Sequence, residues 1–279
     1  MSFKNFVPIV EAERIQKELD KQMVFLENCN REYEGTVEKV GDTVEILNAG
    51  KPTIHSHVDG RLHEHTSEEL EGSSIFMPIK HIEQVAFGVG DIDKHIAKGN
   101  LYDVYLEETK KGFGDKMDAF IASLAADDNI ERYTPANAVT AANILDYLDY
   151  CKVYLEEQNV TESTELTVTG SPKFCDLLRK AYINKGTDKA TTHMQNGQIG
   201  TYNNMIVKMS NNVYKTNESD VNYEWVQIKT NKALAFVKPL LKLEPWRNHK
   251  IHRDELSAFV YYDGMVTRPK EIITLKVKY

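Results

Sequence analysis

The feature that most constrains this chain is a long polar stretch, residues 48–74, with too few large apolar side chains to build a core of its own. Residues 43–47 before it and 75–79 after it have the polar–apolar alternation or apolar run typical of strands. A further alternating segment, residues 33–40, leads into a Gly41-Asp42 turn. We therefore expect an extended, protruding loop with strand-like legs, which needs support from outside itself.

The N-terminal segment predicts an amphipathic helix after Pro8. Its apolar residues recur at steps of three or four, and they are Ala12, Ile15, Leu19, Met23 and Leu26. A helix of this kind at a chain end must bury its apolar stripe against its own domain or against a neighbour.

The strongest helical pattern covers residues 96–126, where apolar and charged residues alternate near the helical period. At about 1.5 Å per residue, some 25 residues of this pattern span roughly 38 Å. Gly112 and Gly114 lie inside it and predict a kink or the close approach of another backbone.

The remainder alternates helix and strand and then becomes strand-rich. Thr134-Pro135 is typical of a helix start and precedes a helical pattern over residues 141–158. A strand is expected at 165–169, a helix from Ser171-Pro172, and a strand at 205–209. Further strands are expected at 233–237, 240–245, 258–262 and 272–277. The fold class predicted is α+β.

Length and composition indicate a globular protein of one large domain or two ordinary ones, with 279 residues of which 41% are hydrophobic. No apolar run reaches the roughly 18 residues of a membrane span. The N-terminus lacks the pattern of a secretion signal, so we expect a soluble protein that is not exported by that route. The net charge is −8, divided as +6 over residues 229–279 and −14 over the rest, so the surface as a whole should not attract polyanions.

Three cysteines, Cys29, Cys151 and Cys175, are far apart and include no Cys-x-x-Cys pair. We expect no disulfide framework, a reducing compartment, and cysteines that act as small buried residues. Trp225 and Trp246 lie in strand-like segments and are expected to be core residues.

A histidine-rich stretch is the strongest candidate for metal chemistry. His55 and His57, like His63 and His65, have the i, i+2 spacing that lets a strand direct two imidazoles to one side. With Glu69, the second pair resembles part of the metal motif of cupin barrels, but the cupin glycine spacings and second histidine motif are missing. We assign no metal, cofactor or catalytic residue and expect a protein that is not an enzyme, with a metal-dependent cupin-type enzyme using the His55–His65 cluster as one alternative.

An isolated monomer would stabilise the expected arm and protruding loop poorly. An arm and a loop without a core lose conformational entropy on ordering, and burial within the same chain does not offset that loss. A repeating assembly resolves this, because each loop can lie across the next subunit.

Ten short segments carry a family resemblance, and they follow one another along the chain as residues 6–8, 30–35, 41–44, 50–54, 91–94, 115–118, 197–202, 210–213, 242–247 and 262–264. In these segments and in their order the chain resembles the major capsid proteins of tailed bacteriophages.

The resemblance implies the tailed-phage major capsid fold. That fold has an N-terminal arm (1–30), an extended β-hairpin loop (31–82), a peripheral domain with a long spine helix (83–132 and 229–279) and an axial domain (133–228). It implies hexamers and pentamers of one chain that self-assemble into an icosahedral head. The head encloses double-stranded DNA without sequence-specific binding and without a membrane. Residues expected at inter-subunit contacts are Arg31, Asp42, Lys51 and Arg61.

Partners implied are a separate scaffolding protein, since the chain has no long N-terminal extension, and a portal. The location implied is the virion, after assembly in the cytoplasm of the host bacterium. An encapsulin-like nanocompartment shell shares the fold and is a second alternative.

Overall fold

The computed structural model describes residues 23–33, 43–48, 73–90, 101–160, 164–184, 198–250 and 252–279. Within these residues the chain is a mixed helix and strand protein, so the expected α+β class is confirmed. Only the end of the expected arm helix lies inside the described residues, as the short helix α2 (Val24–Glu27).

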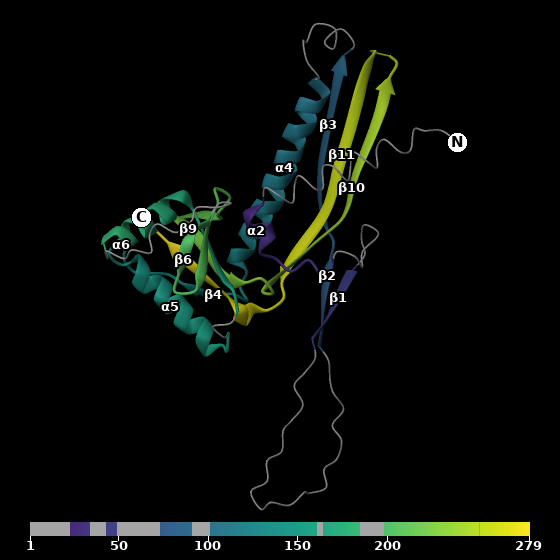
Figure 1. Cartoon of the computed structure of the whole chain (residues 1–279). Coiled ribbons are helices and arrows are strands. Elements are labelled where there is room, and N and C mark those ends of the chain that lie inside the picture. Colours follow the sequence, from purple (N-terminus) through teal and green to yellow (C-terminus); the bar gives the residue numbers. More distant parts are fainter. Residues whose placement is uncertain are drawn as a thin grey trace, which may run out of the picture.

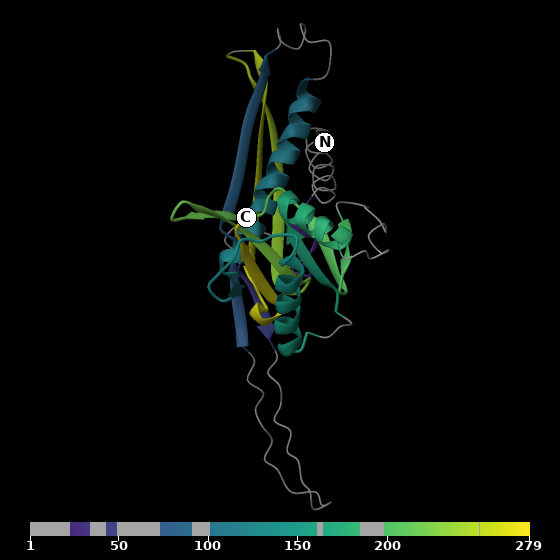
Figure 2. The same cartoon turned by 90° about the vertical axis from the view of Figure 1, so that its left-hand side faces the viewer.

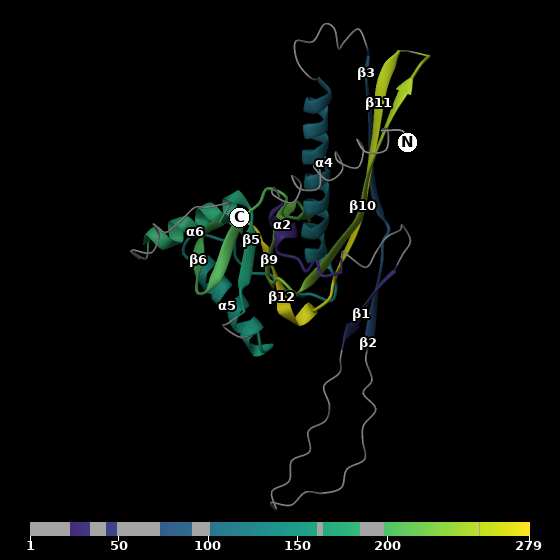
Figure 3. The same cartoon turned by 45° about the vertical axis from the view of Figure 1, so that its right-hand side comes forward.

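A long, narrow sheet and one long helix form the first part of the molecule. Strands β10 (Leu234–Asn248), β11 (Arg253–Val266) and β3 (His81–Gly90) pair in that order, and all pairs are antiparallel. Helix α4 (Leu101–Ser123), continued by the 3₁₀ turn η3 (Leu124–Ala126), runs alongside this sheet (Figures 1 and 3). The expected long helix is thus confirmed, and it continues without a break through Gly112 and Gly114.

Two of the expected strands form one. Residues 233–237 and 240–245 were expected as separate strands, but both belong to β10, whose register with β11 shifts between Val237 and Leu240. Pro239 lies at that shift, and because proline has no backbone N–H it cannot donate to a regular ladder.

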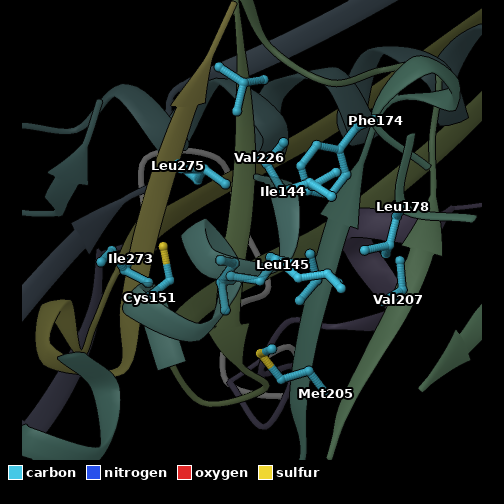
Figure 4. Packing of buried hydrophobic residues seen from close by; sticks show 14 of the residues in the cluster. Ile144, Leu145, Cys151, Phe174, Leu178, Met205, Val207, Val226, Ile273 and Leu275 are labelled. Atoms are coloured by element: carbon cyan, nitrogen blue, oxygen red, sulfur yellow. The ribbon is translucent and has the colours of Figure 1, made fainter. Parts of the chain in front are cut away.

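A seven-stranded sheet forms the second part. Its order is β4 (Glu131–Tyr133), β12 (Ile272–Val277), β9 (Val221–Thr230), β5 (Leu166–Gly170), β7 (Met205–Met209) and β6 (Gln198–Tyr202), with β8 (Lys215–Glu218) also paired to β9. Helices α5 (Ile144–Glu157) and α6 (Pro172–Asn184) pack against one face of it. Figure 4 shows this core, in which Leu145 of α5 and Leu178 of α6 pack with strand residues and Leu178 lies beside Val207 of β7.

The Thr134-Pro135 signal was wrong as a helix start, because α5 begins ten residues later at Ile144. Strand β12 pairs with β9 and β4, so residues 272–277 belong to the seven-stranded sheet although they follow β11 in sequence.

The third described sheet has two strands, β1 (Thr43–Asn48) and β2 (Ser73–Pro78). Its buried residues Val44, Ile46 and Met77 pack against Ala235 and Val237 of β10. The strand-like legs expected at 43–47 and 75–79 are therefore confirmed, whereas the loop between them lies outside the described residues.

Candidate functional site

The last described residues of the arm, 23–30, form a connection between the two parts of the molecule, and we call this segment the arm root. Met23, Phe25 and Leu26 are buried in the core between α4 and the β10–β11 pair. Asn30 continues the segment as a parallel bridge to the start of β10, with Asn30 N donating to Leu234 O at 2.8 Å and Phe236 N donating to Asn30 O at 3.0 Å.

A buried carboxylate on α4 holds the start of the arm root. The Asp118 side chain accepts the main-chain N–H of Phe25 at 2.8 Å and the side-chain amide of Asn212 at 3.1 Å. Ser210 Oγ lies 3.4 Å away as a further donor. Burial raises the pKa of Asp118, and the hydrogen bonds from Asn212 and Phe25 oppose this effect.

A buried lysine on β9 holds the other end. Lys229 is 1% exposed, and its Nζ donates to the main-chain oxygen of Asn28 at 2.5 Å and to Cys29 Sγ at 3.4 Å. Burial lowers the pKa of Lys229. Lys208 on β7 adds a bond from Nζ to Asn28 Oδ1 at 3.1 Å. Side chains from α4, β7 and β9 therefore fix one short segment of the arm.

Several side chains of the seven-stranded sheet that point toward α4 are polar. Gln227 Nε2 donates to the main-chain oxygens of Ile121 and Ala122, both at 3.1 Å, and Thr274 Oγ1 donates to Ala125 O at 3.2 Å. These bonds satisfy carbonyls at the end of α4 that have no partner within the helix. Specific hydrogen bonds thus join the seven-stranded sheet to the end of α4 and to η3.

The long sheet leaves apolar side chains exposed on its face away from α4. Leu256, Ala258 and Val260 of β11 point into the core with α4, so the alternate residues point the other way. Trp246 is 55% exposed and Ile82 is 52% exposed. The expectation of a core position is therefore confirmed for Trp225, at 4% exposure, and wrong for Trp246, since a strand at this open face has nothing described over it.

The residues expected at inter-subunit contacts are mostly untested by the structure. Arg31 follows the arm root and is half-buried. Asp42, Lys51 and Arg61 lie outside the described residues, as do the histidines from His55 to His65. Asp118 and Lys229 were not predicted from the sequence as residues that contact the arm root. The available signal was a lysine among the apolar residues of segment 225–230.

The three cysteines and Ser171 have structural roles in the described part of the chain. All three cysteines are buried and free, which confirms their interpretation as small buried residues. Burial raises the pKa of both Cys151 and Cys175 to about 12, so these thiols are far from the thiolate form that acts as a nucleophile. Ser171 accepts the Phe174 N–H at 3.2 Å and donates to Glu224, which is the geometry of a helix N-cap at α6.

No group of three or more potential ligands among the described residues is placed to hold a metal ion. No helix within the described ranges combines the length and the hydropathy needed to cross a bilayer.

Comparison with solved structures places this fold. A structure from Mycobacterium phage Che8 matches with a TM-score of 0.72 and 23% identity, covering 91% of each chain. The capsid structure of the cyanophage P-SCSP1u matches with a TM-score of 0.71 and 13% identity, covering 92% of this chain and 88% of that one. The holo-SrpI encapsulin complex from Synechococcus elongatus matches with a TM-score of 0.61 and 9% identity, covering 87% and 84%.

No model of a protein family and no curated protein sequence matches the chain. The structural likeness shows the fold alone, and it is the fold of tailed-phage major capsid proteins that the sequence predicted.

Proposed function

We propose that this chain is the major capsid protein of a tailed bacteriophage, a structural subunit whose copies self-assemble into the icosahedral head around double-stranded DNA. The observation that carries the proposal is the structural match of 91% and 92% of the chain to two phage structures, with TM-scores of 0.72 and 0.71. The cupin-type alternative has no support, because the described sheets and helices form a different fold.

In this proposal residues 1–30 are the arm, 31–82 the extended loop, 83–132 and 229–279 the peripheral domain with α4 as its spine helix, and 133–228 the axial domain. The separate cores of the long sheet and of the seven-stranded sheet support two folding units. The pairing of β12 with β9 favours moving residues 272–277 to the axial unit.

Copies are held together in this proposal by many weak contacts. Arg31, Asp42, Lys51 and Arg61 contribute polar pairs, each worth about 0–1 kcal/mol when exposed. Exposed Trp246 and Ile82 contribute apolar area. The net charge of −8 suits a wall that encloses DNA without adsorbing it.

The partners proposed are further copies of the chain, a separate scaffolding protein and a portal. Assembly takes place in the host cytoplasm and the product is the virion. None of these roles requires a bound cofactor or catalysis.

An encapsulin-like shell is the second candidate, favoured by the similarity to the SrpI encapsulin. The two functions differ in content, since a capsid encloses DNA and the encapsulin-like shell would enclose a cargo protein.

The test is to isolate particles from infected host cells, remove external nucleic acid with nuclease, and measure what remains inside. Particles with nuclease-protected double-stranded DNA support the capsid function. Particles that hold protein cargo and no DNA overturn it in favour of the encapsulin-like shell, and failure to find the chain in any particle overturns both.

A further inference from the structure

Helix α5, which packs against the seven-stranded sheet, has acidic and aromatic side chains exposed on one side. On α5, Asp146, Tyr150, Val153 and Glu157 follow one another at steps of four, three and four residues, so they lie on one side of the helix. All four are exposed, and Tyr150 and Val153 are each 52% exposed. We call this set the α5 face.

Aromatic side chains extend the α5 face. Tyr133 stacks on Tyr150 with ring centroids 4.1 Å apart, and Tyr147 meets Tyr133 edge-on at 6.0 Å. Tyr150 is the exposed member of this cluster, and Tyr133 and Tyr147 are half-buried. Aromatic residues are enriched in protein interfaces. Asp146 and Glu157, at the two ends, make no ion pair with any other described residue.

The neighbouring helix presents the opposite charge. On α6, Lys173, Leu177 and Lys180 lie on one side at steps of four and three residues, and we call this set the α6 face. Both lysines are exposed and Leu177 is half-buried. Arg179 adjoins them as a further exposed cation, and Asp176, paired with Lys180 at 2.7 Å, is the one acidic residue of this part of the helix.

The two faces complement each other in charge and in pattern. Each has apolar residues in the middle and charges at its ends, negative on α5 and positive on α6. Asp146 and Glu157 are about 16 Å apart along their helix, and the two lysines are about 10 Å apart along theirs. Long lysine side chains can reach outward to the more widely spaced carboxylates while Tyr150 and Val153 cover Leu177.

Both helices lie on the side of the molecule away from the β10–β11 pair (Figures 1 and 2). Each copy carries the α5 face and the α6 face, which are the two halves of a contact. We propose that the α5 face of one copy docks on the α6 face of a second copy of this chain. The occupant follows from charge complementarity, since an acidic face and a basic face on one molecule allow identical copies to join without another protein. This inference rests on the proposed shell function and names one of its contacts.

The test uses charge reversal in the full-length chain. One variant carries Asp146→Lys and Glu157→Lys, a second carries Lys173→Glu and Lys180→Glu, and a third carries all four changes. A conservative control carries Asp146→Glu and Glu157→Asp. Circular dichroism and thermal unfolding establish that each variant is folded, and all substituted residues are exposed.

We expect each two-site reversal to lower the fraction of chain in assembled particles by about tenfold or more, because like charges then meet across the contact. The four-site variant and the conservative control should assemble as the unmodified chain does. Mixing the two reversal variants should also restore association, because each then offers the other a face of opposite charge.

Assembly of both two-site variants at the unmodified level would overturn the α5–α6 contact while leaving the shell function standing. Loss of assembly without recovery in either the four-site variant or the mixture would also overturn it. If the unmodified chain forms no particles under any condition, the shell function itself fails and this contact fails with it.

Discussion

The side-chain carboxylate of Asp118 on α4 accepts the main-chain N–H of Phe25 at 2.8 Å, although 93 positions separate the two residues in sequence. Phe25 opens the first turn of α2, where main-chain N–H groups have no acceptor within the helix. The same carboxylate binds Asn212, in the segment after β7. One buried group therefore joins the arm root, the long helix and the seven-stranded sheet.

Asp118 should make stability depend on pH in a defined direction. Burial raises the pKa of this carboxyl above the ordinary value of 3.8, so the folded chain binds the proton more tightly than the unfolded chain does. Its contribution to the free energy of unfolding is complete below that value and is lost as the pH rises through the raised pKa. Relative to Asp118→Asn, the unmodified chain should thus lose stability as the pH rises above 3.8.

Urea unfolding of dissociated subunits at a series of pH values from 3.8 upward measures the difference. Asp115→Asn on the same helix, where Asp115 is exposed, is the matched control. A difference between the unmodified chain and Asp118→Asn that is constant, or that grows in the opposite direction, would contradict the assignment.

Two glycines should respond in opposite ways to alanine. A Cβ atom at Gly112 would meet nothing within 4 Å, so Gly112→Ala should raise the free energy of unfolding by about 0.5–1 kcal/mol through helix propensity. A Cβ atom at Gly264 would lie 3.0 Å from both Ala235 O and Ile121 Cδ1, so Gly264→Ala should lower it by about 1–3 kcal/mol. Chemical denaturation of the two variants measures both changes in the free energy of unfolding. Equal changes would contradict the packing of α4 on β11 at Gly264.

The two tryptophans should separate folding from assembly. Trp225→Ala removes a buried side chain and should lower the free energy of unfolding of a subunit by about 3–5 kcal/mol. Trp246→Ala removes an exposed one and should change it by no more than about 0.5 kcal/mol, while reducing the yield of particles. Denaturation of isolated subunits and sedimentation of assembled material give the two readings. Normal particle yield from Trp246→Ala would show that the open face of the long sheet is not a contact.

Removal of residues 49–74 should leave a folded subunit that forms no closed shells. All the described residues of the three buried clusters remain in this variant. Far-ultraviolet circular dichroism and size-exclusion chromatography follow folding, and electron microscopy follows assembly. Normal particles from this variant would refute the role proposed for the loop.

Local sequence patterns were sufficient for much of the fold. The apolar period of residues 96–126 predicted α4, and the runs at 205–209 and 258–262 predicted β7 and part of β11, because both signals arise from residues close together in the chain. The same reasoning placed Trp246 in a core. It failed because alternation in a strand does not say which of the two faces another layer will cover.

The contacts of the arm root were beyond local reasoning. Lys229 reaches Asn28 across 201 positions, and only the tertiary fold brings them together. In the sequence, Lys229 is a single lysine within an apolar segment. That pattern fits an exposed residue of an edge strand equally well. The register of β9 against β5 and β12 decides that this lysine points inward.

The proposed shell function rests on the claim that copies of this chain complete one another. The most direct measurement is the molar mass of the purified full-length chain over a wide concentration range, by size-exclusion chromatography with light scattering, together with electron microscopy of the heaviest fraction. We predict closed particles of many identical copies. A monomer or a small discrete oligomer at every concentration, with or without the capsid partners, would contradict the claim.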